Sequence, residues 1–305
     1  MMSYSMFIDS KAYFGGYPTQ EFVEELENNH NVTYFIDLTC ENEKGIFGYK
    51  TRYNYIKYPI IDNKIPTDNL SFVLFIIRLK KIIDNLNNNK IYIHCRGGHG
   101  RSGIVVSSLL CYMYKINTNI SLEMTTFYYH SRKNLPERRL AQTSPRTNYQ
   151  KTFVHKLFSP LNFYKAYKTG NTIGLSNFSN HPVKTDLGVF PSSEAAFQAY
   201  KDPKNQDYVK RQQNSKSPSY SKFMGKKCNL REDWELVKYD ILYSIIKAKF
   251  EQNEDIKNNL LNTYFRSIVE KNYENNNNKL GIILEKVRSY LFDLEIEKMN
   301  SSLQI

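Results

Sequence analysis

The first half of the chain alternates short apolar runs with segments in which bulky residues recur every three or four positions. Apolar runs rich in β-branched and aromatic residues predict strands, and the longer recurrence predicts helices. The predicted strands are 32–38, 53–58 and 91–94, and the predicted helices are 19–26, 68–86, 104–114 and one from Ser144-Pro145 to about Leu157. This order is typical of an α/β domain with a central sheet and flanking helices.

The second half has a different pattern. Glycines and prolines among polar residues between 170 and 188 indicate loops and short strands, and long helical patterns follow. Those helical patterns cover 193–200, 233–250 and 282–292. The stretch Ser159–Asn162 is the predicted boundary. We therefore expect an α/β domain at 1–158 and a mainly helical α+β domain at 159–305.

Length and composition agree with this division, because 305 residues suit two domains that each bury a core. No apolar run approaches the roughly 20 residues of a membrane span, and the first residues do not resemble a secretory signal. We expect an intracellular, cytoplasmic protein with no membrane partner, in the host cytoplasm if the source is viral. The four cysteines are far apart in sequence, so we expect neither a disulfide framework nor a metal site. We also expect no cofactor.

The net charge of +12 is spread over both halves, with 19 Lys and Arg against 13 Asp and Glu up to residue 155 and 23 against 17 after it. An even excess of this kind favours anionic substrates or loose contact with nucleic acid, without the basic stripe of a dedicated nucleic-acid binder. The densest basic cluster is predicted to be a solvated surface, with the guiding of phosphorylated substrates as the alternative. It comprises Arg132, Lys133, Arg138 and Arg139.

A Cys-x5-Arg loop, Cys95 to Arg101, lies between the predicted strand 91–94 and the predicted helix 104–114. A loop wrapped around an anion at a helix N-terminus stabilises a thiolate at Cys95 through backbone N–H groups and the helix dipole. The planar fork of Arg101 matches two phosphate oxygens, and Ser102 can donate a hydrogen bond to the Cys95 sulfur. Gly97, Gly98 and Gly100 are expected to let the loop curl with its amides inward, because a Cβ would obstruct the backbone angles needed at these positions. The predicted phosphate-binding residues are Arg96, Gly97, Gly98, His99, Gly100 and Arg101.

A general acid is needed upstream to protonate the leaving oxygen, and the segment from Tyr58 to Pro66 offers Asp62. Asp68 is a weaker rival, because it stands where a helix N-cap is expected. His94 and His99 are expected to support the loop through hydrogen bonds. Cys40 and Cys111 are expected in the core, with a disulfide to Cys95 as the alternative.

At these residues the first half, from about Tyr13 to Leu157, resembles the dual-specificity and tyrosine phosphatase superfamily. His94 to Gly103 matches the signature loop, and Asp62 falls in a general-acid loop of the family's form. The resemblance implies hydrolysis of phosphomonoesters through a phosphocysteine at Cys95, on phosphotyrosine, phosphoserine, phosphoinositide or RNA 5'-phosphate substrates. Arg96 favours strongly acidic ones. The segment 144–150 resembles the last helix of the family, where Gln150 either orients the hydrolytic water or is a surface amide.

Residues from about Leu161 to Leu291 resemble the NADAR (YbiA-like) family, which is linked to NAD, ADP-ribose and cleavage of N-glycosidic bonds. The matching pieces are 174–179, 182–186, 193–201, 231–238, 249–253, 268–270, 280–281 and 287–288. Cleavage of a ribosyl C–N bond requires a carboxylate near the anomeric carbon and an aromatic wall for the base. Glu194 is the candidate carboxylate, with a first-turn helix acid as the alternative, and Trp234 is either a wall or a core anchor. The predicted ligand-binding residues are Asn177, Phe178, Glu194, Trp234 and Lys238.

Two departures from that family bear on catalysis. Glu194-Ala195 stands where the family commonly has Glu-His, and 271–278 replaces an Asp-x-x-Trp-Gly segment, with Glu274 as the nearby stand-in for its acid. The sequence therefore predicts a phosphatase fused to a domain that cleaves or binds ADP-ribose-like, NAD-like or ribosylated-base ligands. The alternative is a phosphatase with a non-catalytic module that reads ADP-ribose. The expected partners are a phosphorylated protein or nucleotide and an ADP-ribose-like small molecule.

Overall fold

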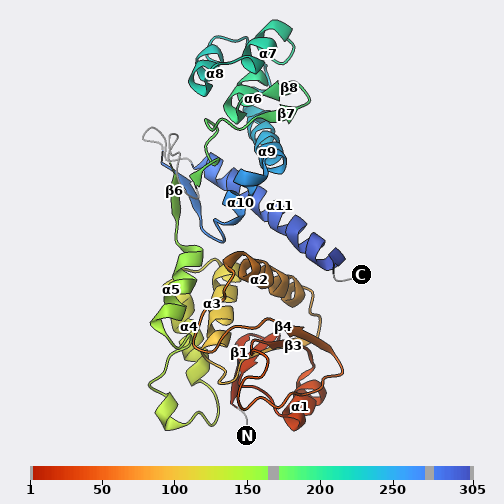
Figure 1. Cartoon of the computed structure of the whole chain (residues 1–305), viewed down its shortest axis with the longest axis vertical. Helices are drawn as coiled ribbons and strands as arrows, with labels where there is room; N and C mark the ends of the chain where they lie inside the picture. Colours follow the sequence, from red (N-terminus) through yellow and green to blue (C-terminus); the bar gives the residue numbers. More distant parts are fainter. Residues whose placement is uncertain (1–2, 164–171, 272–277, 303–305) are drawn as a thin grey trace. The chain divides into compact units, whose positions relative to one another are not determined.

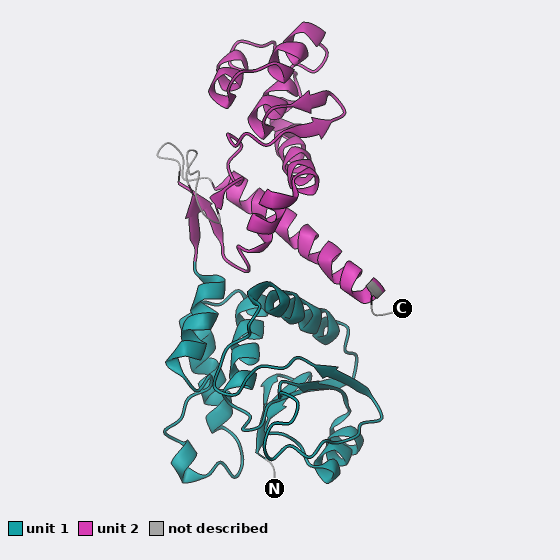
Figure 2. Cartoon of the chain, in the orientation of Figure 1, with its two compact units in different colours: residues 1–159 teal, residues 160–305 magenta. Residues whose placement is uncertain are grey.

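The computed structural model describes residues 3–163, 172–271 and 278–302 (Figure 1). The chain divides into two compact units, Met1–Ser159 and Pro160–Ile305, one residue from the boundary expected from sequence (Figure 2). No helix among the described residues is long and apolar enough to cross a membrane. The expected fold class is confirmed: an α/β unit with a central sheet is followed by a mainly helical α+β unit.

The first unit is built on a five-stranded sheet with the order β1-β2-β5-β3-β4. Its strands are β1 (Tyr4–Ile8), β2 (Ala12–Gly15), β3 (Val32–Asp37), β4 (Asn54–Lys57) and β5 (Lys90–His94). β1 is antiparallel to β2, and the other pairs are parallel. Because the parallel strands end at the same edge, the loops that follow β2, β3, β4 and β5 meet there, which is where α/β sheets place their sites.

Helices cover both faces of this sheet (Figure 1). Helix α1 (Gln20–His30) packs with a cluster formed by Tyr13, Phe22, Leu26, Phe35 and Tyr92 on one face. On the other face α3 (Arg101–Tyr114) packs against α2 (Asn69–Asp84), α4 (Thr118–His130) and α5 (Asn148–Phe158). The side chain of Thr19 caps α1, and that of Asp68 caps α2, where a helix N-cap was expected.

The last helix of this unit begins later than predicted. Thr147, not Ser144, caps α5, and its hydroxyl pairs with the backbone of Gln150 while the Gln150 side chain bonds back to Thr147. Sequence also missed β1, β2 and α4. The other predicted strands and helices of this half are confirmed within a few residues.

The second unit combines short strands with helices. β6 (Leu161–Phe163) pairs in parallel with β9 (Ile268–Glu270), and β7 (Val183–Thr185) forms a hairpin with β8 (Gly188–Phe190). The helices are α6 (Ser193–Ala199), α7 (Gln206–Gln213), α8 (Pro218–Met224), α9 (Trp234–Gln252), α10 (Glu254–Leu261) and α11 (Lys279–Ser302). α9 contacts β7, α6, α10 and α11, so it is the central support of this unit.

Candidate functional site

The Cys-x5-Arg loop, residues 95–101, joins the central strand β5 to the first residue of α3; we call it the cradle. Cys95 is only 2% exposed. Its sulfur accepts the backbone N–H of Gly98 at 3.3 Å and lies 3.6 Å from the Ser102 hydroxyl. The structure thus places the predicted nucleophile, a backbone donor and the predicted hydroxyl together at the start of a helix, where negative charge is favoured.

Gly98 has a positive φ of 74°, and a Cβ there would lie 2.3 Å from the carbonyl carbon of Gly15. Only glycine fits this backbone angle and this approach. The same requirement was predicted for Gly97 and Gly100, and there it is wrong. Neither has a positive φ, and the closest atoms to a Cβ at those positions are 3.3 and 3.5 Å away, on the side chains of His99 and Gln150.

Arg101 is held by Glu43, a residue that sequence analysis missed. Its Nη1 and Nη2 each donate to one Glu43 oxygen at 2.6 Å, and Nη1 also donates to the Ile60 carbonyl at 3.0 Å. Burial acts to lower the pKa of Arg101, but Glu43, Cys95 and Asp62 outweigh it and raise that pKa. Burial likewise acts to raise the pKa of Glu43, and the bonds from Arg101 bring it below its usual value. The pair is therefore ionised.

Asp62 lies beside this guanidinium, with Oδ1 3.2 Å from Arg101 Nη2 and its side chain about half exposed. The predicted general acid therefore reaches the cradle while remaining open to solvent. The rival Asp68 does not, because its Oδ1 accepts the N–H groups of Leu70 and Ser71 at the start of α2.

Both histidines of the loop make supporting hydrogen bonds, as expected. His94 Nε2 pairs with the Tyr49 hydroxyl at 2.7 Å, and His99 Nδ1 pairs with the Gly97 carbonyl at 3.2 Å. Burial lowers the pKa of His94 to about 4, although the Asp37 carboxylate acts in the opposite direction. Burial also lowers the pKa of His99. Both rings are therefore neutral at pH 7.

Arg132 was predicted to lie on a solvated surface, and this is wrong: it is 5% exposed. Its guanidinium stacks over the rings of Phe14 and Tyr129 and donates to the carbonyls of Gly98 at 2.7 Å and Phe14 at 3.2 Å. Burial lowers its pKa to about 10, so it stays charged at pH 7. Arg132 therefore stabilises the cradle through its hydrogen bond to the Gly98 carbonyl.

Gln150 is buried, so its interpretation as a surface amide is also wrong. Its Nε2 donates to the Lys64 carbonyl at 3.1 Å and connects α5 to the loop that carries Asp62. Arg96 is exposed on the cradle. All four cysteines are free. Cys111 lies in the core as expected, but the same expectation is wrong for Cys40, which is half-buried in the loop of Glu43.

A cavity of about 360 Å³ lies in the second unit. All five residues predicted from sequence line it: Asn177, Phe178, Glu194, Trp234 and Lys238. Glu194 is 6% exposed, its backbone N–H bonds to the Asn177 carbonyl at 3.1 Å, and its Oε1 accepts Gln198 Nε2 at 2.8 Å. Trp234 is the first residue of α9, and its ring lies 5.0 Å from that of Phe197. The cavity therefore has a buried carboxylate beside an aromatic wall.

Other lining residues were missed. Glu270, at the end of β9, is a second carboxylate, and Lys201, Lys222 and Lys279 are additional cations. Glu270 belongs to the matched piece 268–270, but nothing in the sequence indicated that its side chain lines the cavity. The lysines come from separate segments, so no local pattern groups them. Ala195 packs in the hydrophobic core and does not line the cavity. Glu274 lies outside the described residues.

Lys249 is fully buried beneath the loop that carries Asn177 and Phe178. Its ammonium donates to the carbonyl of Ser176 at 2.9 Å, to the hydroxyl of Ser179 at 2.7 Å and to the carbonyl of Gly174. Burial lowers its pKa to about 7. The three acceptors match the three N–H donors of an ammonium, so Lys249 fixes the loop from inside.

Comparisons with known proteins follow the same division. The family model "Dual specificity phosphatase, catalytic domain" matches residues 12–156, and the model "NADAR domain" matches residues 162–277. The chain is 32% identical over 292 residues to "Putative tyrosine phosphatase 197R" of Invertebrate iridescent virus 6, with 94% of this chain and 92% of that protein covered.

The second unit has relatives of its own. N-glycosidase YbiA of Shigella flexneri is 33% identical over 141 residues, which cover 41% of this chain and 86% of that protein. The NMR structure of E. coli YbiA matches 46% of this chain and 88% of its own at 30% identity, with a TM-score of 0.40. The chain therefore belongs to the dual-specificity and tyrosine phosphatase superfamily through its first half, and this phosphatase domain is fused to a NADAR domain.

Proposed function

We propose that the first unit hydrolyses phosphomonoesters of a protein or nucleotide through a phosphocysteine at Cys95. The observation that carries the proposal is the position of the Cys95 sulfur, 3.3 Å from the Gly98 N–H and next to the Arg101 fork that Glu43 orients. A phosphate in the cradle meets backbone donors and the remaining N–H groups of Arg101, which stabilise the charge of the transferring phosphoryl group.

In the first step the Cys95 sulfur attacks phosphorus, the bond to the leaving oxygen breaks, and Asp62 gives that oxygen a proton. In the second step Asp62, now a carboxylate, takes a proton from water while the water oxygen attacks phosphorus. The sulfur–phosphorus bond breaks and releases phosphate. Ser102 stabilises the departing thiolate, because its hydroxyl lies 3.6 Å from the sulfur.

Turnover of p-nitrophenyl phosphate by the full chain tests this proposal. Cys95→Ser should abolish turnover but keep phosphate binding, since a hydroxyl does not ionise at neutral pH while the cradle is intact. Arg101→Lys should also lose most activity, because a point charge does not replace a planar fork. Cys228→Ser, in the other unit, is the matched control and should keep full activity. A Cys95→Ser enzyme with a tenth of the wild-type rate would contradict the mechanism.

For the second unit we propose cleavage of an N-glycosidic bond in an ADP-ribose-like, NAD-like or ribosylated-base ligand. The supporting observation is the placement of two carboxylates, Glu194 and Glu270, around one cavity with an aromatic wall. A carboxylate stabilises the oxocarbenium-like transition state, and the rings of Trp234 and Phe197 offer a face for the base.

Binding without cleavage is the second candidate, and Ala195 in place of the family's histidine favours it. Glu194→Gln separates the two, because it removes the charge with little change of shape. If the unit is an enzyme, release of free base should vanish while calorimetric affinity for ADP-ribose persists, and the exposed Glu297→Gln should change neither. If the unmutated chain binds ADP-ribose but releases no free base, the second unit is a module that binds this ligand without cleaving it. Absence of binding would remove both proposals.

A further inference from the structure

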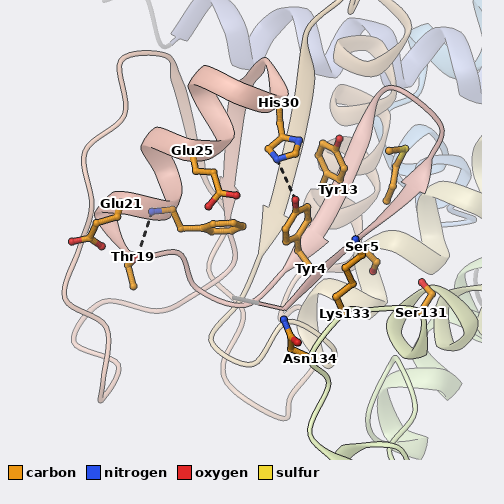
Figure 3. A pocket seen from close by; sticks show the side chains of 12 residues that line it. Tyr4, Ser5, Tyr13, Thr19, Glu21, Glu25, His30, Ser131, Lys133 and Asn134 are labelled. Carbon is orange, nitrogen blue, oxygen red and sulfur yellow. Dashed lines mark hydrogen bonds between the residues drawn. The ribbon is translucent and has the colours of Figure 1, made fainter. Parts of the chain in front are cut away.

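A second and larger cavity, of about 800 Å³, lies along β1 in the first unit, and we call it the edge groove (Figure 3). One wall is α1, which contributes Glu21 and Glu25. The opposite wall is the turn after α4, which contributes Lys133 and Asn134. Tyr4 and Ser5 of β1 lie between the two walls. None of these residues belongs to the cradle.

The edge groove coincides with the free edge of the sheet. Within the described part of the chain β1 pairs only with β2, so its other side presents unpaired N–H and C=O groups. The two walls lie on opposite faces, since Tyr4 contacts the rings of Phe22 and His30 on α1 whereas Ser5 accepts a hydrogen bond from Arg132. A further strand, placed about 4.8 Å from β1, would run between them.

The two walls differ in charge. On the α1 side Glu25 lies near the Tyr4 hydroxyl, and no cation among the described residues forms an ion pair with Glu21 or Glu25. The rings of Tyr4, Tyr13 and Phe22 line the groove beside these acids. They suit the aliphatic part of a Lys or Arg side chain, whose charged end then reaches the carboxylates. On the other side the exposed Lys133 suits polar or acidic side chains.

We propose that the edge groove binds an extended segment of a partner protein, which pairs with β1 as an added strand and alternates basic with polar residues. The basic side chains face α1, and the polar ones face Lys133. Alternation follows from the period of two in a strand, and addition at a sheet edge is an established mode of peptide recognition. A second copy of this chain is disfavoured, because pairing of β1 with β1 would bring two sets of Glu21 and Glu25 onto one face.

A bound segment that pairs antiparallel to β1 is directed toward the cradle. A segment antiparallel to β1 runs parallel to β2 and β5, whose carboxyl ends lead to the phosphate loop. There Tyr17 N–H bonds to the Arg96 carbonyl, and Arg132 connects Ser5 to the carbonyl of Gly98. If the phosphatase proposal holds, the partner's residues that follow the bound segment in its sequence are the ones presented to the cradle. Binding itself does not depend on that proposal.

The test is fluorescence anisotropy with the full chain and a labelled ten-residue peptide of alternating Lys and Thr. We expect saturable binding that Glu25→Lys weakens at least tenfold. Glu24→Lys is the matched control, because it makes the same charge change on the same helix outside the groove, and it should bind like wild type. A peptide with proline at its central positions should bind at least tenfold more weakly, since proline does not donate to a ladder. Thermal unfolding checks that the variants are folded.

Several results would overturn the proposal. These are no binding of the Lys-Thr peptide, equal binding of a Glu-Thr peptide, equal loss in Glu24→Lys and Glu25→Lys, and no effect of proline. A dimer that the peptide dissociates would assign the groove to a second copy and would also overturn it. None of these readouts uses turnover, so a failed phosphatase assay and a failed groove remain distinguishable.

Discussion

Glu43 holds Arg101 end-on, with each carboxylate oxygen 2.6 Å from a different terminal nitrogen of the guanidinium. The Ile60 carbonyl takes the other N–H of Nη1, and Nε is buried with no hydrogen-bond partner among the described residues. The guanidinium is thus fixed from the side away from Nε. This leaves the Nε edge for a phosphate, so we interpret Glu43 as a positioning residue.

Glu43→Gln should lower kcat/KM for p-nitrophenyl phosphate by roughly 10- to 100-fold, because a charge-assisted bond contributes about 1.5–3 kcal/mol. Glu41→Gln, an exposed change in the same loop, is the control and should have little effect. Inhibition by vanadate adds a readout specific to the cradle, and its inhibition constant should rise with Glu43→Gln. Unchanged vanadate affinity would show that Glu43 only stabilises the loop.

Asp62→Asn should slow phenyl phosphate far more than p-nitrophenyl phosphate, because only the poorer leaving group needs a proton. A plot of log kcat against the leaving-group pKa should be steeper for this variant than for wild type. Asp68→Asn should match wild type, since Asn also caps a helix well. Equal losses on both substrates would move the general acid to another residue.

Gly98→Ala should remove nearly all phosphatase activity, whereas Gly97→Ala should keep a substantial part. The Cβ at 98 meets the backbone of Gly15 and Gly16 at 2.3–2.4 Å, but the Cβ at 97 meets only the His99 ring at 3.3 Å. Rates of both variants on one aryl phosphate, with circular dichroism to check folding, test this contrast. Similar rates would mean that the cradle tolerates a shift of β2.

Lys249→Met should weaken ADP-ribose binding by the second unit, because the loop of Asn177 and Phe178 loses its internal anchor. Each carbonyl left unpaired in the interior costs about 1–3 kcal/mol, so unfolding of this unit should also move to lower temperature. Lys247→Met, a half-exposed change on the same helix, is the calorimetric control. Wild-type affinity in Lys249→Met would remove its positioning role.

Stability of the first unit should fall as the pH drops from 6.5 to about 4. In this range the unfolded chain protonates His94 while the folded state does not, because burial lowers the folded pKa to about 4. The resulting decrease in the free energy of unfolding is at most about 3 kcal/mol. His94→Gln should flatten this part of the pH dependence in urea unfolding followed by near-UV circular dichroism.

The two units can be followed separately in that experiment. The single tryptophan, Trp234, lies in the second unit, so its fluorescence reports that unit alone. The fluorescence transition should be the same in wild type and His94→Gln at each pH. An equal pH slope for both proteins in the circular dichroism transition would show that His94 does not contribute.

The site residues that sequence analysis grouped, and that the structure brings together, are close to one another in sequence. Cys95, Gly98 and Ser102 lie in one short segment, the loop 95–101 and the residue after it. The strand before this segment and the helix after it have clear apolar patterns. Glu43 meets Arg101 across 58 residues, and Arg132 reaches Ser5 across 127. No local pattern reports such contacts, because they depend on how the sheet brings distant loops together.

Arg132 shows the physical reason for the largest error. An arginine in a basic cluster has no sequence signal for burial, and exposure is the usual state of such residues. Its burial is compensated by two aromatic rings and two carbonyls that come from β2, α4 and the cradle. Similarly, β1 and β2 are too short and too irregular in pattern to be separated from loop by periodicity alone.

The burial of Cys95 also determines how the protein responds to thiol reagents. Cys40 and Cys228 are half-buried, whereas Cys95 is only 2% exposed within the cradle. Bulky maleimides should modify the two accessible thiols first, so a count of labelled cysteines underestimates damage to the enzyme by small oxidants. The same selection applies to inhibitors, because a reactive group has to enter the cradle before it meets the buried Cys95 sulfur.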